Sequence, residues 1–446
     1  MAWNTDQVLA LAPDPGSAKS GKDLGVARKW VTLGTDGKSA WGTIQGSGKT
    51  PYQASIDLAG PAFKCTCPSR KFPCKHGLGL FLILVQQPAA LTESAPPAWT
   101  TEWLAKRVEK EEKKAAQEAA PSQPPDLEAA AKAAVAAEKR AASRESRVSA
   151  GLDDLATWLN DIVRSGFATL PGKPSAYWQT PAARLVDAQA PGLARRVAEL
   201  DGVTTAGEAW PRTLLRKAAL LHLAREGWSR LGSLAPKHQA DLRSVIGLPL
   251  AQEEVLAQTG LRDRWLVLGR RIVEEDRLRT QRTWLWGRTS NRPALCLSFS
   301  ATASQPLDMS LTPGTEVDAE LAFFPSASPL RALVKQRHGQ PSGDAPVALA
   351  HATIVDANRF AAEAFAANPW TERVPFALAK VIPVRRACGW IVRDAAGHGL
   401  PLAISDATAW KLVALAGGQS LALTGEWDGE TLTPLATWVE RRFLTL

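Results

Sequence analysis

The chain has 446 residues, of which 45% are hydrophobic and 22% are charged, as in ordinary globular proteins. This composition excludes a fibrous or wholly disordered chain, and the length predicts about two to four domains. The formal charge of +9, from 53 basic and 44 acidic residues, permits a polyanionic partner without requiring one.

The N-terminus and the cysteines bear on the cellular compartment. Residues 1–6 lack the basic and apolar segments of a secretory signal. The longest apolar run, residues 78–85, is far shorter than the roughly twenty residues that cross a bilayer. Five cysteines in so long a chain, three of them clustered, do not form the disulfide framework of a secreted domain. We therefore expect a cytoplasmic protein without membrane contact.

Residues 1–88 are rich in glycine and in residues that favour β-strands. Between residues 52 and 58, apolar side chains alternate with polar ones, as in a strand with one buried face. Residues 41–45 predict the antiparallel neighbour of this strand, and the glycines within residues 46–49 suit the tight turn between the two. A short apolar helix is expected over residues 77–85.

Four side chains that ligate metals follow this hairpin within twelve residues. Cys65 and Cys67 are two positions apart, so an extended backbone places both thiols on one face. Cys74 and His76 repeat this spacing and complete a set of three sulfurs and one nitrogen, which suits a tetrahedral Zn²⁺ ion. Because a full set of ligands leaves no position for water or substrate, we expect one structural zinc ion without a catalytic role.

The pattern Cys-x-Cys, a variable loop and then Cys-x-His resembles the SWIM zinc finger at all four ligand positions. With the hairpin and the helix, the likeness extends over about residues 40–87. The resemblance implies zinc binding, with DNA or protein binding as the usual functions and no catalysis. The order of the remaining chain is similar to bacterial SWIM-domain proteins that often lie beside MoxR-type ATPases and von Willebrand A proteins. The resemblance therefore makes these two kinds of protein candidate partners.

Four basic residues surround the ligands: Lys64, Arg70, Lys71 and Lys75. They are candidate phosphate contacts, which would position DNA or RNA without reading its sequence. The alternative is that they are solvated charges, which also offset the net negative charge of a zinc centre with three thiolates. The sequence leaves both interpretations open.

Residues 89–147 change in composition to Ala, Glu, Lys and Gln, interrupted by the proline-rich residues 120–125. Large apolar residues are few, so helices here have no face to bury, and the apolar seam of a coiled coil is missing. We predict a linker of solvated single helices, held by side-chain ion pairs worth about 0.2–0.5 kcal/mol each.

Between residues 148 and 260 apolar residues recur at helical spacing, as in Leu152, Leu155 and Leu159. Pro181 and Pro211 stand where the first turn of a helix would tolerate proline, because the missing N–H has no partner there. Several amphipathic helices therefore follow one another, and we predict that they form a bundle.

After residue 260 the apolar period changes to two, which indicates β-strands. Strands are expected at residues 265–272, 278–286, 294–299, 317–324, 389–393, 421–427 and 432–439, with helices near residues 358–367 and 407–416. The whole chain is thus predicted to be a multidomain α+β protein. Its parts are residues 1–88 with the zinc finger, a linker over residues 89–147, a helical domain over residues 148–260 and a β-rich α+β domain over residues 261–446.

One part of the β-rich domain, residues 262–292, combines many arginines with Trp265, Trp284 and Trp286. Arginine and tryptophan on one face of a strand can stack on nucleic-acid bases. Cross-strand packing of arginine stems over tryptophan rings explains the same composition. Of these two interpretations we favour packing.

Three hypotheses about function follow. The first is a non-catalytic nucleic-acid-binding or adaptor protein, because the finger is ringed by basic residues. The alternative is a protein-interaction scaffold that works with a MoxR-type ATPase or a von Willebrand A protein. An enzyme with its site in the C-terminal half is the weakest hypothesis, since no HExxH, GxSxG or paired-carboxylate signature occurs.

Overall fold

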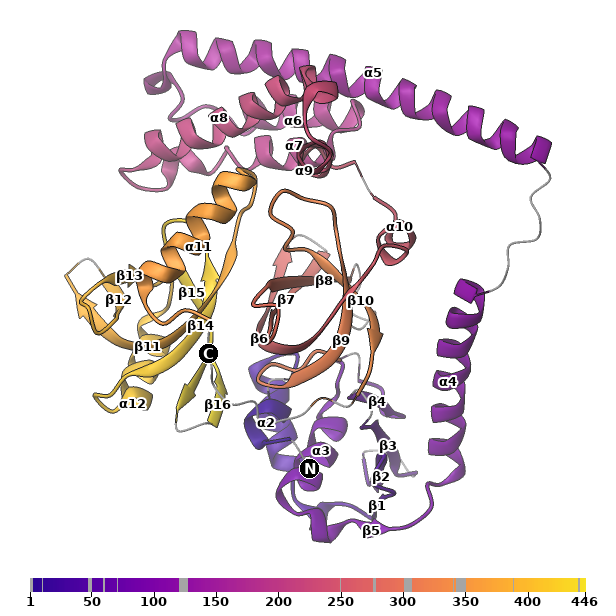
Figure 1. Ribbon diagram of the computed structural model, residues 1–446. Coiled ribbons are helices and arrows are strands. Elements are labelled where there is room, and N and C mark those ends of the chain that lie inside the picture. Colours follow the sequence, from indigo (N-terminus) through magenta and orange to yellow (C-terminus); the bar gives the residue numbers. More distant parts are fainter. Residues whose placement is uncertain are drawn as a thin grey trace.

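The computed structural model describes residues 3–9, 11–46, 50–58, 61–69, 71–119, 127–248, 250–275, 278–300, 307–339, 341, 350–387, 389–439 and 442–446. A five-stranded barrel lies at the centre of the molecule (Figure 1). A helical bundle lies above it in this view, the N-terminal region below it and the C-terminal sheet to its left (Figure 1). This mixed architecture confirms the predicted α+β fold class.

The N-terminal region is a sheet of order β4-β3-β2-β1-β5, in which only the β1–β5 pair is parallel. The predicted hairpin arms are β2 (Ser39–Ile44) and β3 (Tyr52–Asp57), and the predicted helix is α3 (Lys75–Gln86). The other elements are α1 (Thr5–Leu9), α2 (Pro15–Leu24), β1 (Thr32–Thr35), β4 (Ala62–Cys65) and β5 (Thr92–Glu93). Residues 47–49 of the predicted turn lie outside the described residues.

Helix α3 is the centre of the N-terminal core. Its Leu78, Phe81 and Ile83 are fully buried between the sheet and α2. Gly79 allows α2 to approach α3 closely, since a Cβ atom at this position would lie only 2.8 Å from the Cβ atom of Leu24. An apolar helix therefore supplies the packing that the small sheet lacks.

Two helices, α4 (Ala98–Ala119) and α5 (Leu127–Ser165), occupy the predicted linker, and α5 extends beyond it. The first turns of α4 pack on the N-terminal sheet, where Thr100 Oγ1 lies 2.9 Å from Ser55 Oγ. Helix α5 runs unbroken into the bundle. The proline-rich residues 120–125 lie outside the described residues. Among the described residues, no helix is both long enough and apolar enough to cross a bilayer.

The bundle is built around α5, and its core contains the predicted apolar residues Leu152, Leu155 and Leu159. Its other helices are α6 (Ala176–Asp187), α7 (Pro191–Ala198), α8 (Trp210–Ser229) and α9 (Pro236–Ile246), followed by the short α10 (Gln252–Leu256). Pro211 lies in the first turn of α8 as predicted, whereas Pro181 lies inside α6. Helix α6 begins earlier because Trp178, 1% exposed, anchors its first turn in the core.

The central barrel has the strand order β10-β9-β6-β7-β8. Its strands are β6 (Leu261–Glu275), β7 (Leu278–Gly287), β8 (Pro293–Ser300), β9 (Glu316–Phe323) and β10 (Ala332–Arg337). A parallel bridge between Leu295 of β8 and Arg331 beside β10 brings the two edges together. Trp265 and Val267 fill the interior, where both are fully buried.

The C-terminal sheet has the order β13-β12-β11-β14-β15-β16. Its elements are α11 (Ile354–Ala367), β11 (Val374–Arg386), β12 (Gly389–Arg393), β13 (Gly399–Pro401), α12 (Asp406–Ala416), β14 (Leu421–Trp427), β15 (Leu432–Val439) and β16 (Arg442–Thr445). One face packs on the barrel, where Trp284 and Trp286 meet Leu435 and Trp438 in a shared core. The tryptophans of the arginine-rich segment are therefore packing residues.

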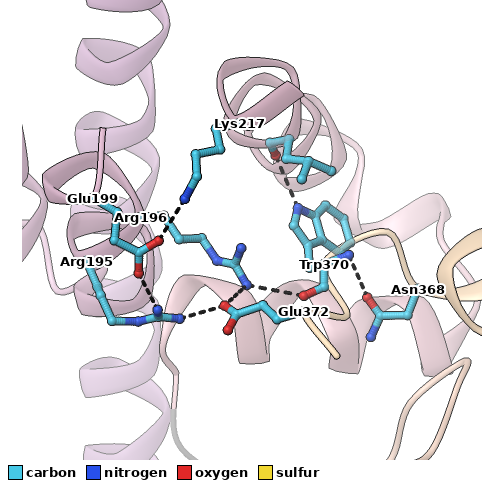
Figure 2. Close-up of polar contacts among 8 residues, drawn as sticks. Arg195, Arg196, Glu199, Lys217, Asn368, Trp370 and Glu372 are labelled. Atoms are coloured by element: carbon cyan, nitrogen blue, oxygen red, sulfur yellow. Dashed lines mark hydrogen bonds and ion pairs between the residues drawn. The ribbon is translucent and has the colours of Figure 1, made fainter. Parts of the chain in front are cut away.

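Polar contacts join the bundle to the segment between α11 and β11 (Figure 2). Glu372 accepts ion pairs from Arg195 at 2.9 Å and from Arg196 at 2.8 Å. Trp370 packs against the core of the bundle, and Asn368 Nδ2 donates to Asp241 Oδ1 at 2.7 Å. These contacts fix the bundle on the C-terminal domain.

Candidate metal centre

The end of one strand and the start of one helix bring the four predicted ligands together. Cys65 is the last residue of β4, and Cys67 follows it in the loop. Cys74 is the N-cap residue of α3, and His76 lies in the first turn of that helix. The four donor atoms all lie within 4.8 Å of one another.

The spacing of the donor atoms suits a tetrahedral zinc ion. Cys65 Sγ lies 3.8 Å from His76 Nδ1. With Zn–S bonds near 2.3 Å and Zn–N bonds near 2.0 Å, the edges of a tetrahedral site are about 3.5–3.8 Å long. Cys74 and His76 are each 6% exposed, whereas Cys65 and Cys67 are half-buried. Three sulfurs and one imidazole nitrogen therefore form a closed, largely buried site for one structural zinc ion.

The thiols of the site differ in acidity. The pKa of Cys74 is lowered to about 4, because hydrogen bonds from Cys65, His76 and the Gly77 N–H stabilise its thiolate against the opposing effect of burial. The same contact raises the pKa of Cys65, which keeps the shared proton, and burial raises that of Cys67. A bound zinc ion replaces these protons, because thiolates are the metal-binding form of cysteine.

Aromatic side chains support the ligands from the hairpin. The Tyr52 ring lies 5.3 Å from the His76 ring, and the Phe63 ring lies 6.2 Å from that of Phe72 in the loop between the two ligand pairs. Gly77 leaves room for Phe63, because a Cβ atom there would lie 2.9 Å from Phe63 Cδ1. The zinc site and the core of the finger are therefore one packing unit.

The four basic residues near the ligands have different environments. Lys64 on β4 and Lys75 at the start of α3 are exposed, and neither forms an ion pair within the described part of the chain. Lys71 pairs with Asp14 at 2.9 Å, and this contact is the main reason why the pKa of Asp14 is lowered to about 2. Arg70 lies outside the described residues.

Asp14 is a residue near the site that the sequence did not reveal. It is the N-cap of α2, where its side chain accepts a hydrogen bond from the Ser17 N–H at 2.8 Å. The Asp14-Pro15 pair is typical of a helix start, which was a usable signal for the cap. Its pairing with Lys71, more than fifty residues away, depends on the tertiary fold.

Comparison with known families identifies two parts of the chain. Residues 64–84 match the SWIM zinc finger, and residues 143–246 match the SWIM-associated four-helix bundle domain. The first match contains all four ligands, and the second runs from within α5 to the end of α9. No curated protein and no solved structure matches the chain significantly.

The class is therefore that of proteins with a SWIM zinc finger. This particular chain carries one such finger, with Cys65, Cys67, Cys74 and His76 placed to hold a structural zinc ion, followed by the helical domain that accompanies SWIM fingers. The predicted resemblance and the predicted cofactor are confirmed.

Proposed function

We propose that this protein is a non-catalytic nucleic-acid-binding protein whose SWIM finger contacts the phosphate backbone of DNA or RNA. The observation that carries the proposal is the exposure of Lys64 and Lys75 on either side of the zinc ligands, with no ion-pair partner among the described residues. Such lysines bind phosphates by charge and do not read bases, so we expect nucleic acids of different sequence to bind with similar affinity.

The charge of the site supports a polyanionic ligand. A zinc ion with three thiolates and one neutral imidazole carries a single net negative charge, which Lys64 and Lys75 together exceed. Lys75 is also the first residue of α3, where the positive end of the helix dipole adds to its potential. Lys71 contributes less, because Asp14 neutralises it.

The test is a binding titration of labelled DNA and RNA with the zinc-loaded chain at several salt concentrations. The double variant Lys64→Ala and Lys75→Ala should bind more weakly, with a shallower salt dependence, because about two phosphate contacts are lost. Lys71→Ala is the matched control and should change the slope little. A Cys74→Ser variant tests whether binding depends on the folded finger.

Two results would count against the proposal. Equal salt slopes for the wild type and the double variant would show that the two lysines do not contact phosphates. Absence of binding at low salt would favour the other hypothesis, in which the finger docks a protein such as a MoxR-type ATPase or a von Willebrand A protein.

A further inference from the structure

The barrel of residues 261–337 has a pairing order with a known functional use. Its first strand, β6, pairs with β7 and β9, β8 follows β7, and β10 lies between β9 and β8. This order, 1-2-3-5-4-1, is that of the OB fold, a small five-stranded barrel. OB folds bind oligonucleotides and oligosaccharides on the outer face of strands 2 and 3. The corresponding strands here are β7 and β8.

The C-terminal sheet covers only one half of that outer face. Trp284 and Trp286 of β7 point outward into the core shared with the sheet, and Leu295 of β8 packs beside them. Side chains alternate along a strand, so Arg282, Thr280 and Leu278 continue the same face of β7. Leu297 and Phe299 continue it on β8. The second half of the face lies beyond the covering sheet.

We call this second half the outer patch, which consists of Arg271, Val273, Leu278, Thr280, Leu297 and Phe299. Phe299 is 46% exposed and Leu278 is 43% exposed, although both lie on a strand face whose other half is buried. An exposed phenyl ring on a strand face presents the surface on which nucleic-acid bases stack.

The patch also carries Arg271, a cation that shares the Glu426 carboxylate with Arg282. Arg282 is bound by Glu426 through two hydrogen bonds of 2.7 and 2.8 Å. Arg271 stands opposite Arg282 in the β6–β7 register, yet it forms no hydrogen bond or ion pair with any described residue. Arg373 lies close enough to act on the same Glu426 carboxylate. Arg373 also pairs with Asp428 at 3.9 Å, so three guanidinium groups face two carboxylates, which leaves one positive charge for an anion.

We propose that the outer patch binds single-stranded nucleic acid, with a phosphate on Arg271 and a base on Phe299. Arg271 and Phe299 lie on strands two places apart and are offset by two residues along the strand direction, a separation of about 12 Å, so one short strand segment reaches both. A duplex keeps its bases stacked on one another, so it cannot use Phe299 in this way. This site is separate from the zinc finger and does not depend on its function.

The test uses the full zinc-loaded chain and the fluorescence anisotropy of labelled oligothymidine, oligouridine and a duplex. Phe299→Ala should weaken single-strand binding by about five-fold or more, since one base loses its stacking partner. Phe299→Trp should retain it. Arg271→Gln should reduce the salt slope by about 0.7, the value of one phosphate contact on a single strand. A preference for oligouridine or oligothymidine tells RNA from DNA as the ligand.

Matched controls separate this site from general effects. Arg279→Gln removes the same charge from the opposite face of the β6–β7 hairpin, and Trp410→Ala removes a 54% exposed ring from α12. Neither substitution should weaken the binding of single-stranded nucleic acid. Single-strand binding that is unchanged in Phe299→Ala, or lost only in the Lys64→Ala and Lys75→Ala double variant, would overturn the proposal. Loss of binding only in the Lys64→Ala and Lys75→Ala double variant would leave the finger as the sole site. Loss of binding only in the Phe299→Ala variant would leave the finger proposal without support.

Discussion

The indole Nε1 of Trp370 donates a hydrogen bond to the main-chain oxygen of Leu220 at 3.1 Å, which ties the C-terminal domain to helix α8 of the bundle. The main-chain oxygen of Trp370 in turn accepts from Arg196 Nη2 at 3.2 Å (Figure 2). One residue therefore makes an apolar contact and two polar contacts across the domain boundary, one polar contact through its side chain and one through its main chain.

Replacing Trp370 should loosen this boundary. Trp370→Ala should lower the stability of the docked state by about 2 kcal/mol, less than for a fully buried ring because Trp370 is half-buried. Calorimetry should then resolve a separate transition for the bundle, and limited proteolysis should cut between α10 and α9 more readily. Trp410→Ala removes an exposed ring and should leave both measurements unchanged. An unaltered calorimetric profile of Trp370→Ala would show that other contacts hold the domains.

Zinc removal should unfold the finger and spare the rest of the chain. Metal ligation contributes on the order of 10 kcal/mol in isolated fingers, so chelation should expose the core around α3. Metal analysis should find one zinc ion per chain, and Cys74→Ser should lose it. Cys296→Ser is the control, because this cysteine lies in the barrel, away from the four ligands. Stoichiometric zinc in the Cys74→Ser protein would refute the assignment of that ligand.

The buried ion pair between Arg282 and Glu426 should be sensitive to the loss of either partner. Glu426 is fully buried, and although burial raises its pKa, hydrogen bonds from Arg282 and Trp284 hold it below the usual value. Glu426→Gln should lower the free energy of unfolding by about 3 kcal/mol, because the half-buried Arg282 guanidinium loses the charge of Glu426. Chemical denaturation measures this change.

The matched control for that experiment is an exposed pair in the same barrel. Arg262 and Asp318 lie 2.8 Å apart at the surface. Asp318→Asn should cost no more than about 1 kcal/mol, because solvent screens such pairs. Equal effects of Glu426→Gln and Asp318→Asn would mean that the buried pair has no special role in joining the two sheets.

His351 should make the C-terminal domain less stable in acid. It is 5% exposed, and burial lowers its pKa from 6.5 to about 4, while its Nδ1 accepts a hydrogen bond from the Ala377 N–H. Between pH 6.5 and pH 4 the His351 side chain is protonated in the unfolded chain and neutral in the folded chain. Stability therefore falls as pH falls through this window, by about 3 kcal/mol at pH 4.

A variant isolates this contribution. His351→Asn keeps an acceptor for the Ala377 N–H and removes the titrating ring, so its stability should vary less with pH between 6.5 and 4. His222→Asn, at an exposed position on α8, should retain the wild-type dependence. The free energy of unfolding from urea denaturation at several pH values is the measurement. Parallel curves for the wild type and His351→Asn would contradict the prediction.

Local patterns predicted the zinc site and much of the fold. The ligands Cys65, Cys67, Cys74 and His76 were visible because their spacing is short and each pair lies at the end of one element. The alternation that predicted a strand at residues 278–286 corresponds to β7, and the expected helix near residues 407–416 corresponds to α12. Short-range periodicity records which face of an element is buried, so such elements are accessible to sequence reasoning.

Long-range relationships were not predictable in the same way. Strand β10 escaped prediction because its residues are mostly half-exposed and give no clear alternation. The pairing of Lys71 with Asp14 joins segments far apart in the chain. The position of Pro181 inside α6 shows tertiary packing prevailing over the local preference of proline for a first turn. These features depend on which elements meet, and one sequence carries no record of that.

The contact between Asp6 and Arg442, whose Oδ2 and Nε atoms lie 3.0 Å apart, places α1 against β16. Met309, from the segment before β9, also packs against the core of the finger. The finger is thus joined to the C-terminal part of the molecule by the backbone and also by these noncovalent contacts. The described elements form a ring in which α1, near the N-terminus, lies against β16, near the C-terminus (Figure 1). A backbone cut between α4 and α5 removes the covalent connection at one point and leaves these noncovalent contacts in place. The two fragments, expressed separately, should reassemble into a split protein that retains both the zinc centre and the barrel.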